Sequence, residues 1–471
     1  MAHDPAMTLT HTTTGPQGLD RLRDRFDGEI VTPADPRYDA LRRVWNGSID
    51  RYPAAILRPA HTDDVAVAIR FARERELVTA IRGGGHSLPG YSSCDGGVVI
   101  DLRLMNRVDV DPARREAVAQ PGLTWSGFDH ATQRHGLATP GGEVSDTGIA
   151  GLTLGGGIGW LRRKHGLTCD NLLGVELVTA AGEVVQADAD HHPDLYWAVR
   201  GGGGNFGVVT SFRYRLHPVG RFVGGMVMHP LERGPAALRF LRELAADAPD
   251  ELSPMAAVIT APPAPFVPEP LRGRPVVVLG AAYFGSLEDG ERALEPLRRF
   301  GPPALDALRP MEYVELQSMV DEANPPGMQG YFKSEMLTGL TDDVIDTVVA
   351  FGESPTSPMA QILLHRLGGV MSRVPRDETA FVHRDGSYMA TVAALWPSPD
   401  DDATRHVEWT RRLWGTMREA SAGTYVNHLG TEGQERVREA YDERTYARLA
   451  RVKAAWDPDN FFRLNQNITP A

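Results

Sequence analysis

The stretch Arg82-Gly83-Gly84-Gly85-His86-Ser87 joins two short β-type runs, at residues 78–81 and 97–102. Three consecutive glycines allow the backbone to approach a ligand closely and to point several N–H groups at it. This stretch therefore predicts an anion-binding loop between two buried strands. Taken alone, it also fits a tight turn without a ligand, with His86 either a hydrogen-bonding turn residue or a reactive group.

Two further glycine clusters follow along the chain. Gly148, Gly151 and the run Gly155-Gly-Gly-Ile-Gly159 stand among apolar residues, and Gly202-Gly-Gly204-Asn-Phe-Gly207 matches the dinucleotide pattern G-x-G-x-x-G. That pattern binds a pyrophosphate when a strand precedes it and a helix follows it, whereas here a helical stretch precedes and an alternating strand follows. We therefore reject a Rossmann domain. Separate glycine clusters, each of which allows a ligand to approach the backbone, suit one long ligand that carries a diphosphate and flat rings.

The composition is that of an ordinary globular protein, with 471 residues, 42% apolar and 23% charged. The formal net charge of −12 disfavours nucleic acid and anionic membranes as partners. The two cysteines, Cys94 and Cys169, cannot form a disulfide framework, and no apolar run is long enough to span a bilayer. We expect a cytoplasmic protein that does not bind membranes.

The pattern along the chain predicts an α+β fold. Residues 1–29 are polar at their start and are expected to form a mobile arm, with order beginning near Ile30. After residue 220, β-type segments alternate with amphipathic helices near 234–247, 287–299, 341–352 and 401–420. This alternation predicts an antiparallel sheet covered by helices on one face. His191-His192-Pro193-Asp194 lacks a third ligand at a fixed spacing, so no metal site is expected.

The chain resembles the FAD-linked oxidases of the vanillyl-alcohol oxidase and p-cresol methylhydroxylase class, in the berberine bridge enzyme-like branch. The resemblance covers residues 30 to 470 and is carried by motifs in the family's order. These are Tyr52-Pro-Ala-Ala-Ile-Leu-Arg-Pro, Arg82-Gly-Gly-Gly-His-Ser, Gly148-Ile-Ala-Gly-Leu-Thr-Leu-Gly-Gly-Gly-Ile-Gly, Asp170-Asn-Leu, Leu195-Tyr-Trp-Ala-Val-Arg-Gly-Gly-Gly-Gly-Asn-Phe-Gly-Val-Val-Thr, Tyr425-Val-Asn, Asp457-Pro-Asp-Asn-Phe-Phe-Arg and Asn465-Gln-Asn-Ile.

The resemblance implies a PCMH-type FAD-binding domain at 30–219, a substrate domain at 220–423, and a C-terminal segment, 424–471, that completes the FAD domain. It implies that His86 carries FAD covalently through the 8α-methyl carbon and that residues 82–87 hold the pyrophosphate. Val144 replaces the cysteine of relatives with two links, so one covalent bond is expected. Thr147 takes the position of a gate for oxygen. The other implied FAD-binding residues are Gly148, Gly151, Gly157, Gly207, Val209, Tyr425, Asn427, Asn465 and Asn467.

For catalysis, a base must take the proton that accompanies hydride loss. Tyr425 is the first candidate, because in a strand it shares a face with Asn427 and the family pattern places that face at the flavin. A free tyrosine has a pKa of about 10, so Lys333 or His365 could assist it. A solvated strand face is the alternative reading of Lys333 and His365. Relatives often carry a carboxylate or aromatic residue where Leu363 stands, so a relative's substrate does not transfer.

The function implied is an FAD-dependent oxidase acting on a small alcohol, phenolic, sugar-like or secondary-metabolite substrate of polyketide or alkaloid type. O2 is the expected electron acceptor and H2O2 the product. Two alternatives remain open: a dehydrogenase of the same fold that uses another acceptor, and a flavin-carrying binding protein without turnover. The sequence does not specify the oligomeric state.

Overall fold

The computed structural model describes residues 16–471, and residues 1–15 of the expected mobile arm lie outside the described residues. The rest of that segment is ordered earlier than the sequence suggests. Helix α1 (Leu19–Arg23) places Leu19 and Leu22 in a buried cluster with side chains of α3 (Thr62–Glu74). Order therefore begins before Ile30, because these apolar side chains find a core to pack on.

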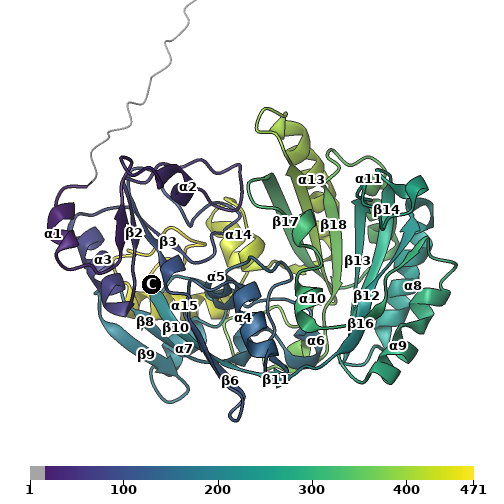
Figure 1. The fold of residues 1–471 in the computed structure, drawn as a ribbon, viewed down its shortest axis with the longest axis horizontal. Coiled ribbons are helices and arrows are strands. Elements are labelled where there is room, and N and C mark those ends of the chain that lie inside the picture. The colour runs from purple at the N-terminus through teal and green to yellow at the C-terminus, as the bar shows by residue number, and fades with distance from the viewer. Residues whose placement is uncertain (1–15) are drawn as a thin grey trace, which may run out of the picture.

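The first part of the described chain forms two sheets (Figure 1). One has the order β1-β2-β4-β3, with β4 parallel to both β2 and β3. The other has the order β5-β6-β10-β8-β9 and is antiparallel. The strands are β1 (Glu29–Val31), β2 (Ala55–Arg58), β3 (Thr79–Arg82), β4 (Val98–Asp101), β5 (Val108–Asp111), β6 (Glu116–Ala119), β8 (Leu172–Val178), β9 (Val184–Asp188) and β10 (Val208–Arg215); β7 (Leu137–Ala138) pairs with β11 (His217–Pro218).

Short helices connect these strands. They are α2 (Tyr38–Arg42), α4 (Trp125–Gln133), α5 (Ile149–Leu154), α6 (Arg162–His165) and α7 (Pro193–Ala198). The glycine run 201–207 lies between α7 and β10, so a helix precedes it and a strand follows it, as predicted. This order confirms the rejection of a Rossmann motif.

The middle of the chain forms one nine-stranded antiparallel sheet. Its order is β15-β12-β14-β13-β18-β19-β17-β20, with β16 paired to β12. The strands are β12 (Phe222–Pro230), β13 (Leu252–Thr260), β14 (Pro275–Tyr283), β15 (Leu305–Asp306), β16 (Arg309–Met311), β17 (Gln329–Leu337), β18 (Gln361–Arg366), β19 (Tyr388–Trp396) and β20 (Ser421–Gly423).

Four helices cover one face of this sheet (Figure 1): α8 (Gly234–Ala246), α9 (Leu287–Arg299), α11 (Asp342–Gly352) and α13 (Ala403–Met417). Their apolar stripes and the sheet residues beneath them form a single buried core, which spans Val223 to Met417. This confirms the predicted antiparallel sheet with helices on one face, and the α+β fold class. Two shorter helices, α10 (Tyr313–Gln317) and α12 (Val370–Arg373), lie outside this layer.

The C-terminal segment returns to the first part of the chain through α14 (Gln434–Glu439) and α15 (Glu443–Trp456). Apolar residues of this segment share a buried core with residues of the first part of the chain such as Trp125; they include Val426, Leu429, Leu449 and Ile468. The uncovered face of the nine-stranded sheet looks toward this assembly (Figure 1). No helix within residues 16–471 combines the length and apolar character that crossing a bilayer requires.

Candidate active site

A cavity of about 420 Å³ is lined jointly by the glycine loops, the uncovered face of the nine-stranded sheet and the C-terminal segment. The sequence-predicted residues that line it are Gly83, Gly84, Gly85, His86, Ser87, Thr147, Gly148, Gly151, Gly207, Val209, His365, Tyr425, Asn427 and Asn465. Residues more than 300 positions apart therefore meet around one space.

The loop that follows β3 contacts the loop that precedes α5 backbone to backbone. A Cβ atom built on Gly84 would lie 2.3 Å from the amide nitrogen of Gly148, so neither position accepts a side chain. Gly85 has φ of +80°, which favours glycine. The N–H groups of Gly84, Gly85, His86 and Ser87 donate to no acceptor within the described residues. The loop is thus a glycine cradle with free donors, as its sequence predicts.

Three of the predicted cofactor residues do not line the cavity. The buried guanidinium of Arg82 donates to the carbonyl oxygens of Ser92, at 3.0 Å, and Arg42, at 3.1 Å. The backbone N–H of Gly157 donates to the Tyr425 hydroxyl. The carbonyl oxygen of Asn467 accepts from Gln434. In this geometry these residues support the walls of the site and do not reach into it.

His86 lies on the cavity wall at the end of the cradle. Its ring stacks on Trp45, with centroids 5.1 Å apart and planes at 22°. Its Nε2 lies 3.0 Å from Oδ1 of Asp146, and its Nδ1 has no hydrogen-bond partner within the described residues. The ring is therefore held on one side and has one nitrogen available.

Tyr425 lies at the start of a 3₁₀ turn, Val426–His428, and not in the strand that the sequence suggests. It nevertheless meets Asn427, because the Asn427 side-chain amide donates to the Tyr425 hydroxyl at 2.9 Å. The hydroxyl also accepts from the N–H of Gly157 at 3.0 Å. Burial raises the pKa of Tyr425 to about 12, against the opposing effect of these two donors.

The sheet face toward the cavity is defined by register. Gln361, Leu363 and His365 of β18 lie beside Ala393, Thr391 and Met389 of β19, and all six line the cavity. Gln361, Leu363 and His365 therefore share the face of β18 that lines the cavity. This face is buried against the cradle side of the molecule, so it is not a solvated strand face.

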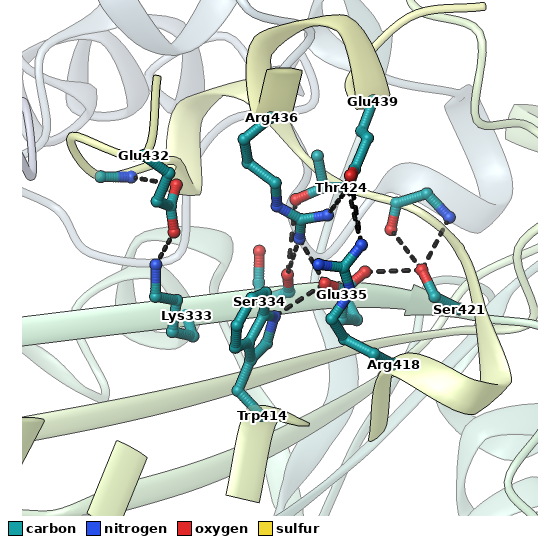
Figure 2. A network of polar contacts seen from close by, with 12 residues as sticks. Lys333, Ser334, Glu335, Trp414, Arg418, Ser421, Thr424, Glu432, Arg436 and Glu439 are labelled. Carbon is teal, nitrogen blue, oxygen red and sulfur yellow. Dashed lines mark hydrogen bonds and ion pairs between the residues drawn. The ribbon is translucent and has the colours of Figure 1, made fainter. Parts of the chain in front are cut away.

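Lys333 does not face the cavity. Its neighbour Phe332 lines the cavity, and alternation along β17 turns Lys333 to the opposite face, over the Trp414 ring of α13. There its ammonium pairs with Glu432, and the adjacent Glu335 accepts from Trp414, Ser421 and Arg436 (Figure 2). The expectation that Lys333 assists Tyr425 is corrected: Lys333 joins the sheet to the C-terminal segment.

The sequence did not predict three functional candidates: Glu143, Arg162 and His428. Glu143 lines the cavity, and its Oε2 lies 2.7 Å from Nε2 of His365. Its Oε1 accepts from the fully buried Arg162 at 3.3 Å. His428 also lines the cavity, and its ring lies 5.0 Å from that of Tyr425. The available signals were a carboxylate beside Gly141-Gly142 and a histidine three residues after Tyr425.

Two regions of the chain match known family models. The model described as FAD binding domain matches residues 53–188, and the model described as berberine and berberine like matches residues 424–469. Together they contain the cradle and the C-terminal wall of the cavity.

Similar proteins cover nearly the whole chain. An FAD-linked oxidoreductase from Dictyostelium discoideum is 34% identical over 96% of this chain and 97% of its own length. The (R)-6-hydroxynicotine oxidase of Paenarthrobacter nicotinovorans is 31% identical over 94% of this chain and 97% of its own length.

The fold shows the same relationship. The crystal structure of a 6-hydroxy-D-nicotine oxidase from Arthrobacter nicotinovorans superposes with a TM-score of 0.85 at 29% identity, covering 95% of this chain and 98% of that chain. With both family models matched and relatives above 30% identity over 97% of their own length, the chain belongs to the berberine-like family of FAD-linked oxidoreductases and is an FAD-dependent enzyme.

Proposed function

We propose that the protein is an oxidase that converts a small alcohol, phenolic, sugar-like or secondary-metabolite substrate to its oxidised product and reduces O2 to H2O2. The observation that carries this proposal is the single cavity that joins the glycine cradle to the His365 face of the nine-stranded sheet. A cofactor in the cradle and a substrate on the sheet would therefore share one enclosed space. A relative named as an oxidase supports the choice of O2 as acceptor.

The residues of the cradle fit FAD. Free backbone N–H groups at residues 84–87 suit a pyrophosphate. Gly151 and Gly204 line the cavity with open space where a Cβ would stand, so a flat ring system could approach the backbone there. Oδ1 of Asn465 is buried without a hydrogen-bond partner in the described part of the chain and could accept from the cofactor. FAD, when bound, supplies the acceptor for the two electrons and the hydrogen that leave the substrate carbon.

We further propose that FAD is attached through His86 alone. The free Nδ1, the ring fixed between Trp45 and Asp146, and Val144 on the cavity wall support a single link. The cytoplasmic location also stays a proposal, consistent with two buried cysteines that form no disulfide.

A peroxide-release screen over alcohols, sugars, phenols and amines tests the proposed function. The FAD-loaded protein should release H2O2 with at least one class, whereas a Gly84→Ala control, in which we expect strongly reduced FAD content, should release far less. If a compound reduces the flavin without air but no peroxide forms in air, the protein is a dehydrogenase. If no compound in the screen reduces the flavin, the binding-protein alternative is favoured.

A further inference from the structure

The cavity wall formed by β18 carries a buried carboxylate and imidazole in direct contact. His365 is 3% exposed, and its Nε2 lies 2.7 Å from Oε2 of Glu143. Across the carboxylate, Oε1 accepts from Arg162, whose guanidinium also donates to the carbonyl oxygens of Gly159 and Arg366, both at 2.9 Å. Glu143 therefore lies between a fixed cation and an imidazole.

This arrangement determines which nitrogen of His365 can accept a proton. A carboxylate accepts hydrogen bonds, so Nε2 carries the hydrogen and Nδ1 keeps the lone pair. Nδ1 is buried and has no hydrogen-bond partner within the described residues. Burial alone would raise the pKa of Glu143, but the attraction of His365 and Arg162 holds it below its usual value. The carboxylate is thus ionised and orients the ring.

Tyr425 is poorly suited to the same task. With its pKa raised to about 12, roughly one molecule in ten thousand would hold a phenolate at pH 8. Its oxygen already accepts two hydrogen bonds, so its own O–H is the group left to donate. Tyr425 is better suited to hold a substrate oxygen than to remove a proton.

We propose that His365, oriented by Glu143, accepts the hydroxyl proton of the substrate, with Arg162 as a positioning residue. This inference rests on the proposed function. The substrate C–H bond breaks and its hydrogen leaves with two electrons, for which bound FAD is the acceptor. The O–H bond breaks, its electron pair forms the second bond of C=O, and the proton goes to Nδ1 of His365. The imidazolium charge is balanced by Glu143.

The surroundings of His365 also narrow the substrate class. The sheet side of the cavity is formed largely by Phe332, Leu363, Met389 and Ala393. Among residues 16–471, the cavity lining contains no Lys or Arg and no carboxylate other than Glu143. Glu143 is already paired on both oxygens, so it offers no free charge to a cationic substrate. The substrate is therefore a neutral, largely apolar alcohol. Oγ1 of Thr391, which has no hydrogen-bond partner among residues 16–471, offers it one more polar contact.

An NMR titration of histidine-labelled holoenzyme without substrate tests the pair directly. His365 is identified by the signal missing in His365→Asn. We expect the Nε2–H tautomer in the wild type and a loss of that preference in Glu143→Gln, because the amide that replaces the carboxylate can donate to Nε2 as well as accept from it. Burial and repulsion from His365 lower the pKa of His428 to about 4, so His428 is uncharged above pH 5. Met255 and Met389 lie beside His365 on the two neighbouring strands and carry no charge. An Nδ1–H tautomer in the wild type, or a tautomer preference unaffected by Glu143→Gln, would overturn the proposal.

The kinetic arm compares His365→Asn with Tyr425→Phe, using the alcohol that gives most peroxide in the screen and His191→Gln as an exposed-histidine control. Loss of general-base assistance is typically worth about 10²–10⁴ in rate. We expect His365→Asn to slow anaerobic flavin reduction by about 100-fold or more, Tyr425→Phe by less than 10-fold and the control not at all. The reverse order would make Tyr425 the base. If no compound in the screen is oxidised, the proposed function fails, but the NMR result still decides whether the Glu143–His365 pair exists.

Discussion

Gly84 and Gly148 touch through their backbones, and a Cβ on either residue would lie 2.3 Å from the amide nitrogen of the other. This contact fixes the loop after β3 against the loop before α5, and both loops line the cavity. The glycine clusters around Gly84 and Gly148 that the sequence shows are therefore two sides of one cradle.

Gly84→Ala should force these loops apart and reduce FAD content strongly, with a lower melting temperature. FAD absorbance per protein and thermal unfolding measure this. Gly415→Ala is the matched control, because a Cβ built on Gly415 meets no atom within 4 Å and Gly415 is an exposed residue within α13. The control should keep its FAD and gain up to about 1 kcal/mol in stability. Normal FAD content in Gly84→Ala would contradict the role given to the cradle.

The single link at His86 predicts that acid-precipitated protein stays yellow and that its intact mass exceeds the polypeptide mass by one FAD. His86→Ala should release its flavin into the acid supernatant, because the only proposed attachment atom is removed. His191→Ala, at an exposed loop histidine, should behave like the wild type. Colourless wild-type pellets would show that the FAD is not covalently held.

Thr147 lines the cavity. Its backbone forms hydrogen bonds with the backbone of Trp125 and Val144, and a change of side chain leaves these hydrogen bonds intact. Thr147→Leu should therefore keep the local fold but narrow the path for oxygen. We expect slower reoxidation of the reduced flavin in air, measured by stopped flow, with Thr147→Ser as the control. An unchanged rate with a native flavin spectrum would remove Thr147 from the oxygen path.

Asp129 of α4 is buried and accepts from Gln317 of α10 at 3.0 Å, and its other oxygen has no hydrogen-bond partner in the described chain. Burial raises its pKa to about 8. The folded protein then binds one more proton than the unfolded chain between about pH 4 and pH 8, so this group makes stability fall as pH rises through that window. Asp129→Asn should remove this dependence, and its melting-temperature advantage over the wild type should grow from pH 5 to pH 8. Parallel curves would contradict the assignment.

The sequence predicted the fold well where local patterns decide it. Strands β17, β18 and β19 and the four covering helices follow directly from residue alternation and helical spacing. The turn at Tyr425 was missed, because its conformation is set by contacts with Gly157 and Asn427 rather than by the β-type residues Tyr425 and Val426.

The site was predicted in part for the same reason. Alternation shows that Lys333 shares a face with Tyr331, but not that this face packs on α13 while His365 faces the cavity. Glu143 was missed because its partner His365 is 222 residues away, and only the tertiary fold brings them together.

The oxidase claim is tested most directly by mixing the anaerobically reduced holoenzyme with air-saturated buffer and measuring flavin absorbance and peroxide together. We expect rapid return of the oxidised spectrum with one H2O2 formed per flavin, as an oxidase requires. A reduced flavin that persists in air and is reoxidised only by an added carrier such as a quinone would contradict it.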